Sequence, residues 1–460
     1  MIEWRKVAEG AGGLRIYRVD AESGNFSGSS GRIPSPLQAA LERFATPTTR
    51  YLLENFGESA APVGASSFSV ACHVVSLPDL LFVVDSTYRT TAGRVFPGVL
   101  EEMVRAEGRR LQERPIRVLY THAHFDHAGG HAAVEALGSD VEILAHPFTE
   151  ELFPVVSRRE SFLRTRAGFF RDCGITLDLD AMTEEIRGLY LRRMQEAGVD
   201  FDRAPWGSVE EGPLRVDRHV EPDGALLSLA DARLELLRFD GHIPGHLCVR
   251  VDGRHLITGD MWLPATTSLV TPGTLAALAG VPSERCGLLR YLESSLRLLD
   301  LDVDECTSYP SHEVVFHNPK RMAMRDLEIF AERVSMVYAV LREHEREPMR
   351  VLDVAWGGRA HLPIWKVEGS TFRLVIAHDE AAAWVQDLAA LGDLREVEPE
   401  RYVWTGGWEL ASRIRDALAL ARERYAHLEF RSRGSSAPET AEDGKPGEPQ
   451  RGSGSREGLQ

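Results

Sequence analysis

The chain has 460 residues, of which 43% are hydrophobic and 27% charged, and its formal net charge is −16. This length exceeds one simple core and predicts roughly two or three domains. The negative charge argues against non-specific binding of nucleic acid or anionic lipid, and no run of about 18 apolar residues occurs, so no membrane span is expected. Five cysteines without a CxxC pair, and a start that lacks a secretory signal, favour a reducing compartment and hence a cytoplasmic protein.

The first third of the chain predicts an extension followed by a layered body. Residues 1–65 are expected to form an N-terminal extension, because they carry Gly/Ser-rich stretches around one short helical segment. From Phe68 onward two β-rich runs flank the turn signal LPD, which predicts a hairpin that enters a sheet. A helical stretch, the strand IRVLY, a second helix and the strand VEILA follow. Alternating strands and helices of this kind indicate an α/β fold.

The rest of the chain is predicted in four parts. Residues 150–215 interrupt the alternation and are expected to form a helical insertion, before sheet-like sequence resumes. Residues 321–430 predict a long amphipathic helix, then a helix and a short hairpin, which is the outline of a small winged-helix-like module. Its ten basic and thirteen acidic residues over 350–430 argue against a DNA-binding face. Residues 431–460 are rich in Gly, Ser, Pro and Glu and predict a disordered tail.

One short segment carries most of the chemistry. The sequence THAHFDHAGG follows a predicted strand and precedes a predicted helix, and it holds three histidines and a carboxylate within six positions. Neutral imidazole and carboxylate are strong ligands for zinc and related metals. Side chains two apart near a strand end point the same way, so His122 and His124 can bind one ion. Asp126 and His127, from the turn beyond, can serve a second ion.

Together with four further elements, this segment resembles the HxHxDH signature of the metallo-β-lactamase superfamily. The further elements are Asp85 in LLFVVD, His242 in GHIPG, Asp260 in TGD and His312 in YPSH. The resemblance covers about residues 66–320. It implies a four-layer αββα sandwich as the catalytic domain, with 150–215 as an insertion or cap.

The resemblance also implies how the ligands are shared. One ion would be held by His122, His124 and His242, and the other by Asp126, His127 and His312, with Asp260 between them. Two divalent ions are therefore expected, with zinc favoured and iron or manganese as alternatives. They would supply a metal-bound hydroxide, and Asp126 would orient it or pass its proton to the leaving group.

The expected function is a dinuclear metal-dependent hydrolase that cleaves an ester, thioester or lactone. A phosphodiesterase or nuclease of the same fold is an alternative, because a two-metal clamp also suits phosphorus. An iron-dependent oxidoreductase on the same scaffold is another, although the flavodiiron pattern has glutamate where this chain has His124. The partner is expected to be a small molecule and neither nucleic acid nor membrane, and a homo-oligomer is left open.

Substrate contacts are predicted at four positions. Trp262 and Tyr309 adjoin expected ligands and could line the site. Arg164 and Arg166 belong to a basic cluster in the insertion, which predicts either a solvated helix face or a cap that pairs with an anionic substrate. His131 and His246 each lie four residues beyond an expected ligand, and either could support that ligand from behind.

Overall fold

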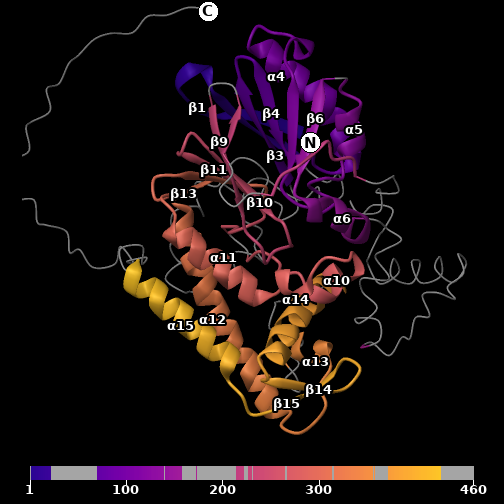
Figure 1. Cartoon of the computed structure of the whole chain (residues 1–460), viewed down its shortest axis with the longest axis vertical. Helices are drawn as coiled ribbons and strands as arrows, with labels where there is room; N and C mark the ends of the chain where they lie inside the picture. The colour runs from indigo at the N-terminus through magenta and orange to yellow at the C-terminus, as the bar shows by residue number, and fades with distance from the viewer. Residues whose placement is uncertain are drawn as a thin grey trace, which may run out of the picture.

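The computed structural model describes residues 2–21, 70–138, 140–157, 172, 214–221, 226–229, 232–264, 267–312, 315–355, 357 and 371–425. Two mixed β-sheets form the body of the molecule (Figure 1). The seven strands of the first sheet lie in chain order: β1 (Ile2–Glu9), β2 (Arg15–Ala21), β3 (Val70–Leu77), β4 (Leu80–Val84), β5 (Ile116–Tyr120), β6 (Val141–Ala145) and β7 (Arg218–His219). The second sheet has the order β13-β12-β11-β10-β9-β8, with β8 (Leu226–Leu229), β9 (Ala232–Arg238), β10 (Leu247–Val251), β11 (His255–Gly259), β12 (Thr307–Pro310) and β13 (Phe316–His317).

Alternating side chains explain how the two sheets pack. In β4, Phe82 joins a buried cluster with residues of the second sheet, whereas its neighbour Leu81 joins the cluster under the helices. In β10, Val249 likewise faces the first sheet and Cys248 faces away from it. Successive side chains of a strand point to opposite faces, so the sheets lie face to face with an apolar layer between them.

Helices cover the outer face of each sheet, which makes the α-β-β-α layering expected from the sequence. Those on the first sheet are α3 (Arg89–Arg94), the π-helical turn η2 (Val95–Val99), α4 (Leu100–Ala106), α5 (His131–Glu135) and α6 (Pro147–Val156). The helical stretch expected after β4 is therefore present but divided. It ends at Ala106, just before Gly108 with its φ of +76°.

The C-terminal elements pack on the outer face of the second sheet. They follow α10 (Gly273–Leu278) and α11 (Leu288–Asp300), and comprise α12 (Pro319–Glu343), α13 (Val351–Ala355), α14 (Thr371–Ala390), β14 (Leu394–Glu398), β15 (Arg401–Trp404) and α15 (Glu409–Arg424). Phe330, Trp384 and Ile414 share one apolar cluster with Leu256 of the sheet. The expected long helix, and the helix followed by a hairpin, are confirmed. The likeness to a winged helix stays a prediction.

The N-terminal residues have a role that the sequence did not reveal. Strands β1 and β2 lie within the segment expected to be an extension, yet they continue the first sheet beyond β3 in antiparallel register. The side chains of β2 from Ile16 to Ala21 are all buried. Residues 2–21 thus belong to the sandwich, whereas residues 22–69 and the C-terminal tail lie outside the described part of the chain.

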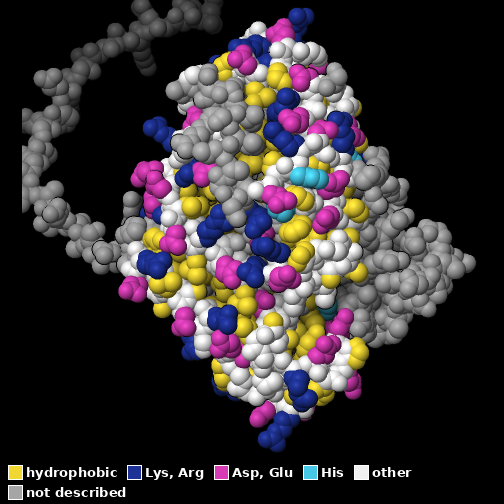
Figure 2. Space-filling view, viewed as in Figure 1, with side chains coloured by type: hydrophobic (Ala, Val, Ile, Leu, Met, Phe, Trp, Pro, Cys, Tyr) yellow, Lys and Arg dark blue, Asp and Glu magenta, His cyan; other side chains and the backbone are white. Residues whose placement is uncertain are grey.

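Helix hydropathy and surface charge are the features of the described residues that bear on binding partners. No helix in the described ranges is long and apolar enough to cross a membrane. The face seen in Figure 2 carries basic and acidic side chains side by side.

Candidate metal centre

The first group of ligands gathers at the end of β5. His122 Nε2 lies 2.9 Å from His124 Nδ1, and His242 Nε2 lies 3.3 Å and 3.1 Å from the same two atoms. Two metal–nitrogen bonds of about 2.05 Å at a tetrahedral angle would place their nitrogens ~3.3 Å apart. The three imidazoles thus converge on one point with the spacing that a single ion requires.

The second group lies beside the first and has two carboxylates. His312 Nε2 is 3.2 Å from Asp126 Oδ2, and His127 Nε2 is 3.8 Å from the same oxygen. Asp260 Oδ1 is 3.2 Å from His127 Nε2 and 3.4 Å from His312 Nε2. Its other oxygen, Oδ2, is 3.6 Å from His242 Nε2 and 3.9 Å from His122 Nε2. One carboxylate therefore faces both groups, as a bridging ligand does.

Two buried polar atoms without hydrogen-bond partners indicate that the site suits metal ions. His127 Nε2 and Asp260 Oδ1 are both buried and have no hydrogen-bond partner among the described residues. Buried polar atoms without partners are costly, so native sites normally satisfy them with protein, water or an ion. A cation between them would satisfy both. The donor set of imidazoles and carboxylates suits a divalent ion in each group.

Asp85 fixes the strand end that carries these ligands. Its Oδ1 accepts hydrogen bonds from the backbone N–H of Thr121 at 2.7 Å and from the Thr121 hydroxyl at 2.9 Å. Its Oδ2 lies 2.9 Å from His127 Nδ1, so that nitrogen donates to the carboxylate and Nε2 is turned to the metal centre. A carboxylate that accepts a hydrogen bond from the other ring nitrogen of a histidine ligand, as that of Asp85 does here, fixes the tautomer and orientation of the imidazole. Asp85 has a φ of +67°, an uncommon conformation that is held by these contacts.

His242 is oriented from the loop that follows β11. Its Nδ1 lies 2.8 Å from the Leu269 carbonyl oxygen and 2.9 Å from the Ser268 hydroxyl. The preceding Gly241 has a φ of +123°, and a Cβ there would lie 2.5 Å from the Tyr291 backbone. Only glycine lets the chain pass this close to α11, so the third histidine depends on a backbone position that no other residue fits.

The pKa values divide the two groups by charge. Burial lowers the pKa of His122 well below its usual range and that of His124 to about 3, which leaves both imidazoles in the neutral, metal-binding form. Burial alone would also lower the pKa of His312, but the carboxylates of Asp260 and Asp126 outweigh it and raise the pKa to about 10. The two carboxylates of the second group therefore stabilise a positive charge beside them, and a divalent cation would supply that charge in place of protons.

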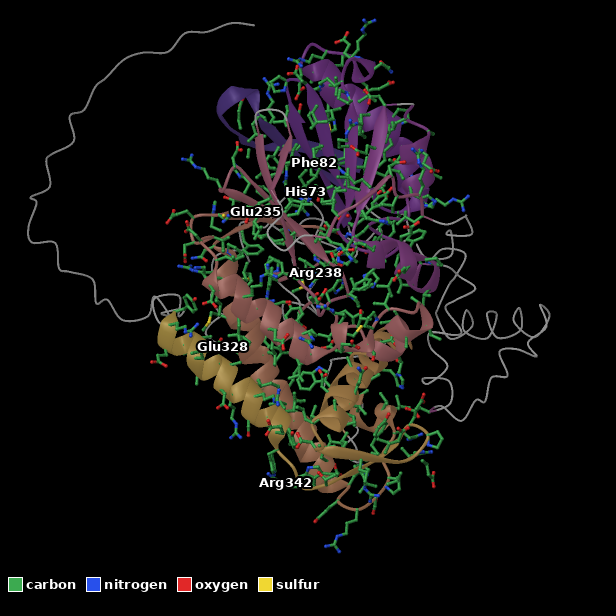
Figure 3. All side chains as sticks on the ribbon, viewed as in Figure 1. His73, Phe82, Glu235, Arg238, Glu328 and Arg342 are labelled. Atoms are coloured by element: carbon green, nitrogen blue, oxygen red, sulfur yellow. The ribbon has the colours of Figure 1, made fainter. Side chains whose placement is uncertain are left out.

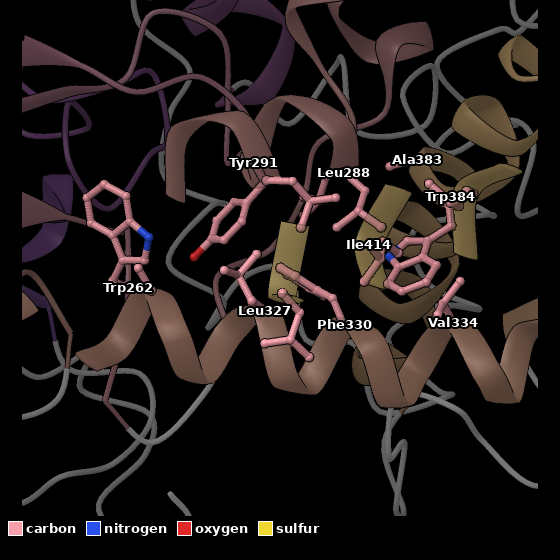
Figure 4. Packing of buried hydrophobic residues seen from close by; sticks show 14 of the residues in the cluster. Trp262, Leu288, Tyr291, Leu327, Phe330, Val334, Ala383, Trp384 and Ile414 are labelled. Atoms are coloured by element: carbon pink, nitrogen blue, oxygen red, sulfur yellow. The ribbon is translucent and has the colours of Figure 1, made fainter. Parts of the chain in front are cut away.

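All seven predicted ligands come together, but the predicted substrate contacts do not. Trp262 is fully buried, donates to Ser295 and packs on Phe239 in the cluster outside the second sheet (Figure 4). Tyr309 is buried between the sheets and contacts His255. We correct both expectations, because each ring packs in an apolar core. Arg164 and Arg166 lie outside the described residues.

Of the supporting histidines, one belongs to the site and one does not. His246 is buried against His122, with ring centroids 4.9 Å apart. His131 instead packs edge-on against Phe153 of α6, with ring centroids 5.4 Å apart, under the helices of the first sheet. Sequence reasoning missed Ser268 and Leu269, which carry no motif. Only the fold brings that loop to His242.

One protein family and several solved structures are similar to this chain. The family described as the metallo-beta-lactamase superfamily matches residues 67–312, more than half of the chain. A beta-lactamase domain protein from Burkholderia ambifaria is 18% identical, with 75% of this chain and 90% of that chain covered at a TM-score of 0.51. A metallo-beta-lactamase family protein from Thermus thermophilus is 21% identical, with 75% and 96% covered at a TM-score of 0.48. No curated protein sequence matches the chain.

The chain belongs to the metallo-beta-lactamase superfamily, and its intact His/Asp cluster is that of a metal-dependent hydrolase. The similarity to the Burkholderia structure supports the fold. The Burkholderia structure covers 75% of this chain, which is more residues than the family match over 67–312 contains. The structural similarity therefore extends to residues outside that span.

Proposed function

We propose that the protein is a dinuclear hydrolase that cleaves an ester, thioester or lactone. The observation that carries this proposal is the position of Asp260, whose two oxygens face two separate ligand groups. Divalent ions held by these two groups would lower the pKa of bound water and would polarise the substrate oxygen. Zinc is the proposed metal, since the donor set of histidine and carboxylate suits it.

The protein's own groups hold and open this site in a defined way. His122, His242 and His127 are buried, whereas His124, Asp126 and His312 are partly exposed. A substrate therefore approaches from the side of those three residues. Asp126 lies on that open side with His312 3.2 Å away, so its carboxylate is placed to orient a nucleophile or to pass a proton to the leaving group.

Two other activities are kept as alternatives. Phosphodiester cleavage needs the same pair of ions, and nothing in the ligand geometry distinguishes it from carboxylic ester cleavage. An iron-dependent oxidoreductase is less well supported, because His124 contributes a nitrogen to the first group where the flavodiiron pattern has glutamate. A panel of esters, thioesters, lactones and phosphodiesters, assayed on protein of known metal content, separates the first two.

The sharpest test of the hydrolase is His124→Ala. Loss of a first-group ligand should lower kcat/KM by three orders of magnitude or more, which corresponds to about 4 kcal/mol of transition-state stabilisation. His317→Ala is the matched control, because that histidine is exposed on β13 and should leave turnover unchanged. Turnover retained by His124→Ala without bound metal would end the proposal.

A further inference from the structure

His246 lies beneath the proposed metal centre and has no ligand role in either group. It precedes β10, and its backbone is fixed on both sides: its N–H donates to the Ile243 carbonyl at 3.3 Å, and its carbonyl accepts from the Phe239 N–H at 2.9 Å. The side chain is fully buried. The imidazole is thus held firmly in contact with a ring that is predicted to bind metal.

The ring of His246 contacts both ligand groups through different atoms. Its face stacks on His122, with centroids 4.9 Å apart and an interplanar angle of 29°. Its Nε2 accepts a hydrogen bond from the backbone N–H of Asp260 at 3.2 Å. His246 therefore joins a ligand of the first group to the main chain of the bridging residue.

The hydrogen bond replaces a contact that the sheet does not supply. The pairing of β11 with β10 ends at Ile257, and that of β11 with β12 ends at Gly259. The N–H of Asp260 thus lies just past the ladder and is buried. A buried donor must find an acceptor, and here the acceptor is an imidazole nitrogen instead of a strand carbonyl.

Gly259 makes the approach of the imidazole possible. Its φ is +56°, and a Cβ at this position would lie 2.6 Å from His246 Nε2 and 2.9 Å from its Cε1. Any side chain at 259 would push the ring away from the Asp260 N–H. The TGD turn is therefore shaped to receive His246 as well as to aim the carboxylate.

We propose that His246 is a positioning residue that sets the bridging carboxylate, by accepting the backbone N–H of Asp260 while its ring seats His122. This inference rests on the proposed function, since it concerns the bridge of the same dinuclear site. Without the acceptor, the main chain at Asp260 would turn to satisfy its N–H elsewhere, and Oδ1 and Oδ2 would no longer face both groups. Partners behind a ligand commonly change metal affinity by about 10–100-fold when they are removed.

The experiment compares two substitutions at 246 by titration of metal-free protein with Zn²⁺ alone. His246→Phe keeps a flat ring against His122 but removes the acceptor, and should weaken the binding of the second Zn²⁺ by about 10–100-fold. His246→Gln places an amide oxygen near the position of Nε2, and should return the affinity to within about threefold of the unsubstituted protein. A residue that only fills space would give the opposite order.

His73→Phe is the matched control for a buried histidine. His73, labelled in Figure 3, has both ring nitrogens without hydrogen-bond partners among the described residues. It contacts Tyr309 between the sheets and belongs to neither ligand group. Its substitution should change thermal stability but leave Zn²⁺ affinity unaltered.

A second route breaks the same contact without altering His246. Gly259→Ala should displace the ring and weaken the second Zn²⁺ site in the same way as His246→Phe. The control is Gly253→Ala, which has a similar φ of +70° but open space around the added Cβ. Because both changes remove one contact, the double variant His246→Phe/Gly259→Ala should bind Zn²⁺ no more weakly than the weaker single variant.

The outcomes separate the proposal from its alternatives. Wild-type Zn²⁺ affinity in folded His246→Phe, or equal losses in the Phe and Gln variants, overturns the positioning role. If His246→Phe does not fold, Gly259→Ala decides, and wild-type affinity in that variant overturns the role. Since Zn²⁺ binding is measured without substrate, a protein that binds two ions but hydrolyses nothing refutes the proposed function and leaves this inference standing.

Discussion

Asp260 is the residue on which a two-ion site most depends. Its Oδ1 faces His127 and His312, and its Oδ2 faces His122 and His242. Asp260→Ala should therefore lower the metal content from about two ions per chain to one or fewer. Metal analysis of the purified proteins, beside the control Asp252→Ala in the β10–β11 turn, measures this directly. Two ions retained in Asp260→Ala would show that Asp260 is not the bridge.

His146 provides a pH-dependent stability that is separate from the ligands. It is the N-cap of α6, where its Nδ1 accepts from the Phe148 N–H at 3.1 Å. Burial, with smaller contributions from Arg238 and Arg285, lowers its pKa to about 4. An unfolded histidine has a pKa of about 6.5, so the unfolded chain binds this proton more tightly between pH 6.5 and 4. The folded state should thus lose stability as the pH falls through that window.

His146→Asn removes this titration and keeps a side chain suited to the helix start. The free energy of unfolding of the unsubstituted protein, relative to His146→Asn, should fall by about 2 kcal/mol from pH 7.5 to pH 4.5. Denaturation curves in chelator measure it, since metal binding then drops out of both proteins. A difference that is constant with pH would show that His146 is not protonated on unfolding in this range.

At the scale of elements, the C-terminal helices are joined to the segment after α6. Asp172 is buried, and it is the one residue between 158 and 213 that the structure describes. Its Oδ2 accepts from the Leu352 N–H at 2.9 Å and lies 3.1 Å from His378 Nε2, and its carbonyl accepts from Arg350 at 2.6 Å. Helices α13 and α14 therefore hold one point of the predicted insertion.

Removal of that carboxylate should weaken the attachment. Asp172→Ala removes the acceptor of the Leu352 N–H and the carboxylate that lies 3.1 Å from His378 Nε2, so stability should fall by about 1–3 kcal/mol. Thermal unfolding compared with Asp140→Ala, which loses only an exposed contact 3.6 Å from Arg117, isolates the effect. Equal unfolding temperatures in the two variants would contradict the role given to Asp172.

At the scale of the whole molecule, the arginines that follow α6 bear on the charge of the substrate. Ser157 donates to the carbonyl of Ala123, between two ligands, at 2.6 Å, so the chain leaves the metal centre just before the arginine-rich sequence. We propose that the substrate has a phosphate or carboxylate remote from the scissile bond. Neutralising Arg164 and Arg166 together should then raise KM far more than it lowers kcat, as loss of uniform binding does.

The salt dependence of KM gives an independent check on this proposal. Partly exposed charge pairs are screened over about 8–10 Å at physiological ionic strength, so KM for an anionic substrate should rise with salt. An unchanged KM in the double variant, or a preference for neutral esters, would contradict the proposal. The arginines would then be interpreted as part of a solvated helix face.

Four of the seven ligands could be predicted from the residues themselves, because they lie within six positions at one strand end. The other three, His242, Asp260 and His312, were implied by the family resemblance. At that strand end, local spacing and the period of two already fix which side chains converge. The β-rich runs on either side of the LPD turn likewise predict the hairpin of β3 and β4. These features are local in the chain, and a short window contains all that determines them.

Tertiary structure alone decided the rest. Trp262 adjoins the TGD turn, but a φ of +56° turns its ring into the core outside the second sheet, a direction that no residue pattern encodes. Strands β1 and β2 join the first sheet across a long intervening segment. His246 reaches the Asp260 N–H only because β10 begins beside the end of β11. Each of these depends on contacts between distant parts of the chain, whose geometry is set by packing of the whole fold and not by the local sequence.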